Sequence, residues 1–310
     1  MKTLNTYINE KLVLNKNTFK GPEYKYFPKN KYELRKIIRD IINRLTDKQK
    51  KEDILDLNDI DTSEITDMSN LFDNNNDIKS IKRIDISGWN TGSVENMEYM
   101  FYNCQNLTDI GDLSSWNVSN VKSMKYMFYE CRNIESLGKL DNWNTRKVTS
   151  MTNMFSDCLK IESLGDLSSW DISLVTNMAY MFFNCIKLKY LGDLSKWKTD
   201  KVVNMASVFQ NCKILEDIGD LSSWNTEKVT NMTGVFKYCK KLKSIGDIGG
   251  WNVGKVKCLS ELFFGCEELT DVGDLSDWEE KWDICIHCSN GNMKDIVRFS
   301  SVKRPWWNYY

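Results

Sequence analysis

The sequence is poor in the residues that mark several common protein classes. It has one histidine, three prolines and 16 glycines among 310 residues, which argues against a collagen-like or disordered chain. It contains no phosphate-binding glycine loop and no nucleophile elbow. No apolar run approaches the length of a membrane span. We therefore expect no enzymatic activity and no cofactor.

The first residues and the charge distribution narrow the expected location and partners. The opening segment MKTLNTYINEKLVL has no apolar core of the kind that a signal peptide requires, so we expect a cytoplasmic or virion-associated protein and doubt cell-surface display. Residues 1–56 carry 14 Lys and Arg against 8 Asp and Glu, and the remainder carries 28 against 35. This asymmetry is too modest to predict nucleic-acid binding.

A 27-residue repeat dominates the chain. One unit reads L-x-x-I-G-D-L-S-S-W-N-T-x-x-V-x-x-M-x-x-M-F-x-x-C-x-x. Such a period is typical of a solenoid, in which each coil buries its apolar residues against its neighbours. The tryptophans that mark the unit are Trp89, Trp116, Trp143, Trp170, Trp197, Trp224, Trp251 and Trp278. Cysteine, phenylalanine and glycine columns keep the same step.

Each unit combines two periodicities. The segment V-x-x-M-x-x-M-F has apolar residues at helical spacing, so we expect a short helix from Val94 to Phe101. The segment from Ile81 to Trp89 reads I-x-x-I-x-I-x-x-W, which fits the strand of a leucine-rich repeat with Trp in the usual Asn position. Later units insert a glycine there, which predicts a kink with positive φ. The expected fold is an α/β leucine-rich-repeat-like solenoid with one short strand and one short helix per coil.

The flanking segments predict caps. We expect a short amphipathic docking helix over 1–14, a helical N-terminal cap over 15–56, about nine coils over 57–302 with the first and last degenerate, and an aromatic tail over 303–310. Within the cap, Lys31 to Leu45 has the pattern of an amphipathic helix. The tail contains Trp306 and Trp307, which either cover the last coil or dock a partner.

The units resemble the leucine-rich repeats of the BspA-type bacterial surface-protein family. The resemblance lies in W-N-T-x-x-V-T-N-M, as in Trp224 to Met232, and covers residues 57–302. It implies a curved, non-enzymatic solenoid used for adhesion or contact with a protein partner. Similar repeats also occur in bacteriophages and large viruses, so a structural component of a virion or cell envelope is the alternative.

The tryptophan and cysteine columns predict side chains that are buried in the core of the array. A buried indole needs an acceptor for its N–H, and the backbone carbonyls of the next coil supply one. We therefore expect an internal Trp ladder instead of an aromatic platform for sugars or bases. Cysteine behaves as a small buried hydrophobe, and one cysteine per coil lacks the clustering that zinc requires.

One cysteine motif lies outside the cysteine column. Cys285 and Cys288 enclose the only histidine, His287, and Cys258 lies 27 residues before Cys285. These four residues form a weak candidate for a zinc site or a redox pair. Capping of the last coil is the interpretation we favour.

The acidic column of the repeat has two interpretations. The acidic column follows the glycine, where Asp is common as a turn residue that bonds its own backbone; an acidic stripe for a basic partner or cation is the alternative. Its members are Asp112, Asp166, Asp193, Asp220, Asp247 and Asp274, and Lys139 interrupts it.

An aromatic cluster flanks the Met-Phe pair of the first units. It predicts either a docking patch, because aromatic residues are enriched at interfaces, or packing against the N-terminal segment. Its members are Tyr99, Tyr102, Tyr126, Tyr129, Tyr180 and Phe183. The sequence predicts a protein partner without identifying it, and it leaves the oligomeric state open.

Overall fold

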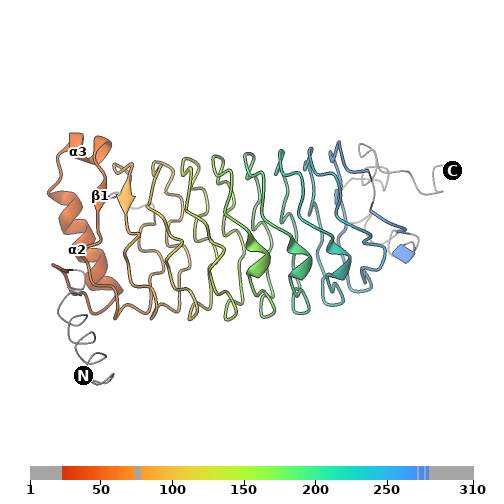
Figure 1. The fold of residues 1–310 in the computed structure, drawn as a ribbon, viewed down its shortest axis with the longest axis horizontal. Helices are drawn as coiled ribbons and strands as arrows, with labels where there is room; N and C mark the ends of the chain where they lie inside the picture. The colour runs from red at the N-terminus through yellow and green to blue at the C-terminus, as the bar shows by residue number, and fades with distance from the viewer. Residues whose placement is uncertain (1–22, 74–77, 271, 276, 279–310) are drawn as a thin grey trace, which may run out of the picture.

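In the part of the chain that the structure describes, the protein is a stack of coils with two helices at its N-terminal end (Figure 1). The computed structural model describes residues 23–73, 78–270, 272–275 and 277–278. The coils lie side by side along the long axis of the molecule, and their interior is one continuous core of apolar side chains. No helix in the part of the chain that the structure describes is long and apolar enough to cross a membrane.

Helix α2 (Lys31–Asn43) lies against the first coil. The Asn30 side chain accepts hydrogen bonds from the backbone N–H groups of Tyr32 and Glu33, which satisfies two of the free donors at the start of the helix. Residues Leu34, Ile38 and Ile42 are spaced by four and are buried, so one side of the helix faces the core. The sequence pattern predicted this helix to within two residues at its end.

A second, short helix follows. Helix α3 (Asp47–Glu52) begins with a capping box, in which the Thr46 side chain and the Gln49 side chain each accept from the other residue's backbone N–H. After it, strand β1 (Leu55–Asp56) pairs in parallel with strand β2 (Ile84–Asp85). This pairing joins the helical end to the repeat array.

Ion pairs reinforce the contact between the helical end and the first coil. Four cations of residues 25–35 each meet a carboxylate of residues 59–73, at distances of 2.6–2.9 Å. The pairs are Lys25 with Asp59, Lys29 with Glu64, Lys31 with Asp67, and Arg35 with Asp73. Most of these side chains remain partly exposed, so each pair adds little stability by itself, but together they fix the position of α2.

A parallel ladder connects the coils along one side. Its bridges join Asp67, Asn96, Ser123, Ser150, Asn177, Asn204, Asn231 and Cys258 in turn. Beyond each bridge, alternate backbone N–H groups donate to carbonyls of the next coil. Met97 donates to Ser123, Tyr99 to Lys125, Phe101 to Met127 and Asn103 to Tyr129. The backbone polar groups of this segment are thus satisfied between coils.

The predicted helix in V-x-x-M-x-x-M-F is wrong. The described residues of the array contain no α-helix. This segment is a run of overlapping turns in which some N–H groups donate to a carbonyl three residues back and the others donate to the next coil. Two positions per coil adopt left-handed backbone, such as Tyr99 at φ 56° and Asn103 at φ 59°. A right-handed helix excludes such residues. The apolar spacing of three therefore comes from turns that return Met and Phe to the core.

The strand predicted in every coil is also wrong for most coils, where pairing is limited to single bridges. Apart from β1 and β2, the L-x-x-I segment forms isolated parallel bridges, such as Ser163 with Tyr190 and Tyr190 with Asp217. The glycine after each such segment has positive φ, between 77° and 89°, as the sequence predicted. This kink ends strand pairing after one or two residues, because the chain leaves the extended conformation there.

The glycine kink is packed against the acidic column. In the described coils, the carboxylate of one coil lies where a Cβ on the next coil's glycine would be, as with Asp166 and Gly192. A Cβ on Gly192 would lie 1.9 Å from the Asp166 Oδ1. After the glycine, three coils form short 3-10 helices: η1 (Leu167–Ser169), η2 (Leu194–Lys196) and η3 (Leu221–Ser223). Glycine is therefore needed for both its backbone and its lack of a side chain.

Substitution of Gly192 by Ala should destabilise the fold. The backbone there has φ +86°, and the added Cβ must also displace the Asp166 side chain. We expect the free energy of unfolding to fall by about 1–3 kcal/mol, measured by urea denaturation. Gly250 is the matched control, because an added Cβ there meets nothing within 4 Å. Equal losses at Gly192 and Gly250 would contradict the packing argument.

Candidate functional site

The tryptophan column is core, as the sequence predicted. From Trp89 to Trp251 the side chains are 1–4% exposed. Each indole Nε1 donates to a backbone carbonyl of the preceding coil, as in Trp197 to Leu167 at 2.9 Å and Trp224 to Leu194 at 2.9 Å. Three neighbouring pairs of rings stack with centroids 6.0–6.2 Å apart: Trp143 with Trp170, Trp197 with Trp224, and Trp224 with Trp251. These residues are therefore unavailable to a ligand.

The cysteine column is also core. All seven thiols of the column are buried and free, and each Sγ donates to a phenylalanine carbonyl, as in Cys185 to Phe155 at 3.1 Å. Burial raises the pKa of every one of these thiols; that of Cys266 rises to about 12. A buried thiol with a raised pKa is a poor nucleophile and a poor metal ligand.

The aspartates of the acidic column bond their own backbone. The Oδ1 of Asp112, for instance, accepts the N–H of Ser114 at 2.8 Å, and Asp193 accepts that of Ser195 at 3.0 Å. Hydrogen bonds from Ser195 hold the pKa of Asp193 below its ordinary value. Where Lys139 interrupts the column, the Asp141 carboxylate accepts the backbone N–H of Asp166 instead, at 2.9 Å. The Asp141 carboxylate therefore bonds the next coil and not its own turn, and partner binding by the acidic column stays a prediction.

Four tyrosines of two adjacent coils form a compact cluster, here called the tyrosine block: Tyr99, Tyr102, Tyr126 and Tyr129. Tyr99 stacks on Tyr126 with centroids 4.9 Å apart, and Tyr102 stacks on Tyr129 at 5.1 Å. Edge-to-face contacts join the two stacks, at 5.3–6.2 Å. All four side chains are half-buried. Each of the four residues therefore keeps part of its surface in contact with solvent.

Charged groups surround the tyrosine block. The Lys125 Nζ lies 5.9 Å from the Tyr99 ring centroid and 5.6 Å from that of Tyr126, within the range of a cation–π interaction. Burial and the neighbouring Glu130 raise the pKa of Tyr129 to about 12, so its hydroxyl keeps its proton at physiological pH. The block can therefore donate as well as accept hydrogen bonds.

The other predicted aromatic residues lie two coils further along. Tyr180 and Phe183 contact each other edge to face at 5.7 Å. The coil between them and the block carries Asn153 and Ser156, which are nearly or fully buried. The structure therefore brings four of the six predicted aromatics into one block and keeps Tyr180 and Phe183 as a separate pair.

Two features of a second ladder were not predicted from the sequence. This second ladder, here called the opposite ladder, consists of the bridges between L-x-x-I segments, such as Ser163 with Tyr190. Tyr190 projects there with 48% of its side chain exposed, between coils that carry Ser163 and Asp217 at the same position. Charged pairs run alongside it, because Glu at one coil meets Lys 27 residues away, as in Glu162 with Lys189 at 2.7 Å and Glu216 with Lys243 at 2.8 Å. Comparing charges at a separation of 27 would have predicted these pairs.

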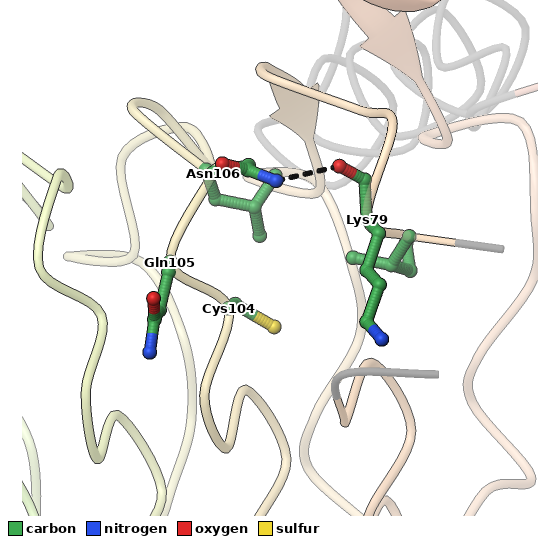
Figure 2. Close-up of a pocket in the computed structure, with 6 residues that line it drawn as sticks. Lys79, Cys104, Gln105 and Asn106 are labelled. Atoms are coloured by element: carbon green, nitrogen blue, oxygen red, sulfur yellow. Dashed lines mark hydrogen bonds between the residues drawn. The ribbon is translucent and has the colours of Figure 1, made fainter. Parts of the chain in front are cut away.

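A cavity of about 210 Å³ opens beside the second coil (Figure 2). Lys79, Cys104, Gln105 and Asn106 contribute to its lining, and the Asn106 side chain donates to the Lys79 carbonyl at 2.7 Å. Its lining combines one cation with a buried thiol of raised pKa, and we see no arrangement there that could perform acid–base or nucleophilic chemistry.

The remaining candidates fall outside the described residues. These are Cys285, His287, Cys288, Trp306 and Trp307, together with the docking helix predicted over 1–14. Cys258 is described and is only partly buried, in the ladder position that other coils fill with Asp, Asn or Ser. Within the ranges that the structure describes, no cluster of three or more His, Cys, Asp or Glu could hold a metal ion.

Comparison with known proteins places the repeat in a family. No curated protein matches the chain. A solved leucine-rich repeat protein from Bacteroides ovatus is 21% identical over 63% of this chain and 61% of that chain, with a TM-score of 0.22; the matched part therefore spans about three fifths of that protein. One family model matches three times, over residues 42–163, 112–215 and 188–284. Because these matches cover most of the sequence, the chain belongs to the BspA-like repeat family described as "Mycoplasma protein of unknown function, DUF285".

Proposed function

We propose that this protein is a non-enzymatic, leucine-rich-repeat-like scaffold that binds a protein partner through the tyrosine block. The observation that carries the proposal is the half-buried stacking of Tyr99 on Tyr126 and of Tyr102 on Tyr129. Tyrosine supplies a large amphipathic contact area and is enriched at energetically important interface positions. Because stacking and the ladder bonds of both coils fix these rings, little side-chain entropy would be lost on binding.

The helical end supports the scaffold in this proposal. Helix α2 buries Leu34, Ile38 and Ile42 over the first coil, and four ion pairs join residues 25–35 to that coil. We propose that residues 15–56 act as the N-terminal cap of the array, which an open stack requires because its end coil would otherwise expose apolar side chains.

The test is a comparison of two variants of the full chain. Tyr102→Ser with Tyr129→Ser removes one stack of the block, and Tyr190→Ser removes an exposed tyrosine of the opposite ladder. Proteins captured from a lysate of the source organism are quantified for each variant, and a protein that is lost only with the double variant is purified. Its affinity for the wild-type chain should then fall about 30-fold or more in the double variant, measured by calorimetry.

Stability measurements complete this test. The melting temperature of the double variant must be recorded, because Tyr102 and Tyr129 are half-buried and their loss will weaken packing. The proposal fails if the purified partner binds the folded double variant as tightly as wild type. It also fails if the Tyr190→Ser control loses the same affinity.

A further inference from the structure

The tyrosine block contains two columns of stacked rings, and both columns continue two coils further along. Tyr126 and Tyr129 meet edge to face with centroids 5.3 Å apart and planes at 66°, and Tyr180 and Phe183 meet in the same way at 5.7 Å and 70°. Tyr126 and Tyr180 also share a left-handed backbone, at φ 58° and 59°. Because each residue of the second pair lies two repeat units after its counterpart in the first, Tyr180 continues the column of Tyr126 and Phe183 that of Tyr129.

The coil between these pairs holds short side chains at the ring positions, Asn153 and Ser156, and this place is here called the ring gap. Two coil steps, roughly 10 Å at the spacing of paired strands, separate the rings on either side. A flat group in the ring gap would therefore lie about 5 Å from each of them. The centroids of Tyr99 and Tyr126 stack at nearly the same separation, 4.9 Å. The ring gap thus has the spacing of one missing ring.

The ring gap also contains polar groups that lack partners. Asn153 is 9% exposed, and its side-chain amide forms no hydrogen bond with any residue that the structure describes, although buried amides are normally paired. Asp157 accepts hydrogen bonds from the Ser156 hydroxyl at 3.1 Å and from the Asn184 amide at 2.6 Å. Among the described side chains, no cation lies within ion-pair distance of the Asp157 carboxylate. The ring gap therefore offers acceptor oxygens and a negative charge without a counter-ion.

On the coil of the ring gap and the coil before it, the cations that flank the ring positions already have partners. They are Arg132, which lies 3.2 Å from Glu130, Lys160, which lies 3.6 Å from Glu135, and Lys125, which lies over the rings of Tyr99 and Tyr126. The charge of Lys125 is offset by Glu98, which holds the same position in the preceding coil. The block therefore leaves the charge of Asp157 uncancelled.

An arginine side chain matches this combination. A guanidinium group is flat, permanently charged and carries only hydrogen-bond donors. It stacks on aromatic rings at centroid distances up to about 6 Å, which the ring gap allows on both sides. An aromatic side chain would leave Asp157 and Asn153 without partners, which weakens binding. A lysine ammonium lacks the flat face that stacks between two rings.

We propose that the ring gap binds an arginine side chain of a protein partner. The guanidinium group lies between the rings of the flanking coils and donates to the Asp157 carboxylate and to the side-chain oxygen of Asn153. The inference rests on the proposed function, because the tyrosine block supplies the rings on one side of the ring gap. It identifies the group that the partner presents there.

The probe for this inference is N-acetylargininamide, titrated into the isotope-labelled full chain and followed by the NMR shifts of the backbone amides of residues 153–157. We expect saturable shifts with a Kd of about 1–10 mM, as for a single anchoring side chain. N-acetyllysinamide should bind at least about fivefold more weakly. Equal affinities for the two probes would overturn the inference, and so would shifts that show no saturation up to about 50 mM of the arginine probe.

Asn153→Tyr fills the ring gap and leaves the tyrosine block complete. Tyrosine suits this position because Asn153 has φ 55°, close to the values of Tyr126 and Tyr180. The variant should weaken binding of the arginine probe about tenfold or more. The matched control is Ser207→Tyr, at φ 56° and 3% exposed, on the other side of Tyr180. It adds the same ring outside the ring gap and should leave the Kd unchanged within about twofold; equal losses in both variants contradict the proposal.

Asp157→Asn removes the charge without changing the shape of the side chain, so it tests the site even where Asn153→Tyr does not fold. It should weaken binding of the arginine probe about fivefold or more, and an unchanged Kd in either variant overturns the inference. A partner captured through the tyrosine block separates the two proposals. If that partner binds Asn153→Tyr as tightly as wild type but is lost with the double variant of Tyr102 and Tyr129, the arginine inference fails and the protein-binding function stands.

Discussion

By about pH 10 the folded chain should have lost about 10 kcal/mol of unfolding free energy relative to neutral pH, because its seven column cysteines keep their protons only when folded. Burial raises the pKa of each of these thiols above the ordinary value of 9.0. The unfolded chain exposes them to water and restores that ordinary value. We therefore expect steep alkaline unfolding.

The direction of the effect follows from the raised pKa. Below about pH 9 both states hold the thiol protons, so the cysteines do not make stability depend on pH. Above it, the unfolded state releases protons while the folded state keeps them, up to the folded pKa, which for Cys266 is about 12. Each thiol then favours unfolding by about 1.4 kcal/mol per pH unit. Ion-paired lysines such as Lys241 and Lys243 also have raised pKa values, but they titrate higher.

Urea midpoints measured in a reducing buffer at several pH values between neutral and pH 10 check this expectation. The matched control is Cys185→Val, which replaces one thiol with an apolar group of similar size. It should lower stability at neutral pH, since the Phe155 carbonyl loses a donor, but should reduce the alkaline slope by about one seventh. A midpoint that stays constant from neutral to pH 10 would show that the thiols are not protected.

Trp197→Ala should lower the free energy of unfolding by about 3–5 kcal/mol. The Trp197 side chain is 2% exposed, its Nε1 donates to the Leu167 carbonyl at 2.9 Å, and its ring stacks on that of Trp224. Truncation leaves a cavity in the centre of the array, where coils on both sides limit collapse. Chemical denaturation followed by circular dichroism measures the loss.

Two comparisons make the tryptophan experiment specific. Trp197→Phe keeps an aromatic ring but removes the N–H donor, and should fall between wild type and Trp197→Ala. Tyr190→Ala removes an exposed aromatic side chain of the same unit and should change stability by less than about 0.5 kcal/mol. If Trp197→Ala were as mild as Tyr190→Ala, the ladder would contribute little to folding.

The apolar columns could be predicted because each depends on residue type and a fixed step alone. A tryptophan, a cysteine or a phenylalanine repeated every 27 residues has one environment, and burial is the environment that all three favour. The positive φ of the glycine column was predictable for the same reason. The helix over 31–45 also followed directly from its apolar spacing.

The helix predicted inside each coil was wrong because apolar residues three positions apart occur both in an α-helix and in a run of successive turns. The signal that separates them lies in the left-handed positions, which in later coils hold Asn184, Asn211, Gly234 and Gly265. Asn and Gly are the residues that tolerate this conformation, so their recurrence indicates turns. Tyr99, Tyr126 and Tyr180 occupy the position that Gly234 fills in a later coil, and they conceal that signal there.

The candidate site was only partly predictable. The six aromatics could be recognised from their place beside the core residues, but their grouping into a block depends on ring stacking between coils. That stacking requires the inter-coil ladder, in which Tyr99 donates to Lys125, and the expected helix would have separated the rings. Tyr190 was missed because the equivalent positions of other coils hold no aromatic residue, as with Arg83, Asp109, Ser163 and Asp217.

Because a ladder joins each coil to the next, the length of the molecule increases in equal steps with the number of coils. The bridges of the ladder from Asn96 to Cys258 each link a residue to its counterpart one unit away, so the inner coils present similar partners on both of their faces. Adding or removing one whole unit changes the length by about one strand spacing, roughly 4.8 Å, and creates no new kind of junction. The separation between the helical end and any side chain on the coils is therefore set in equal steps, by the number of units encoded between them.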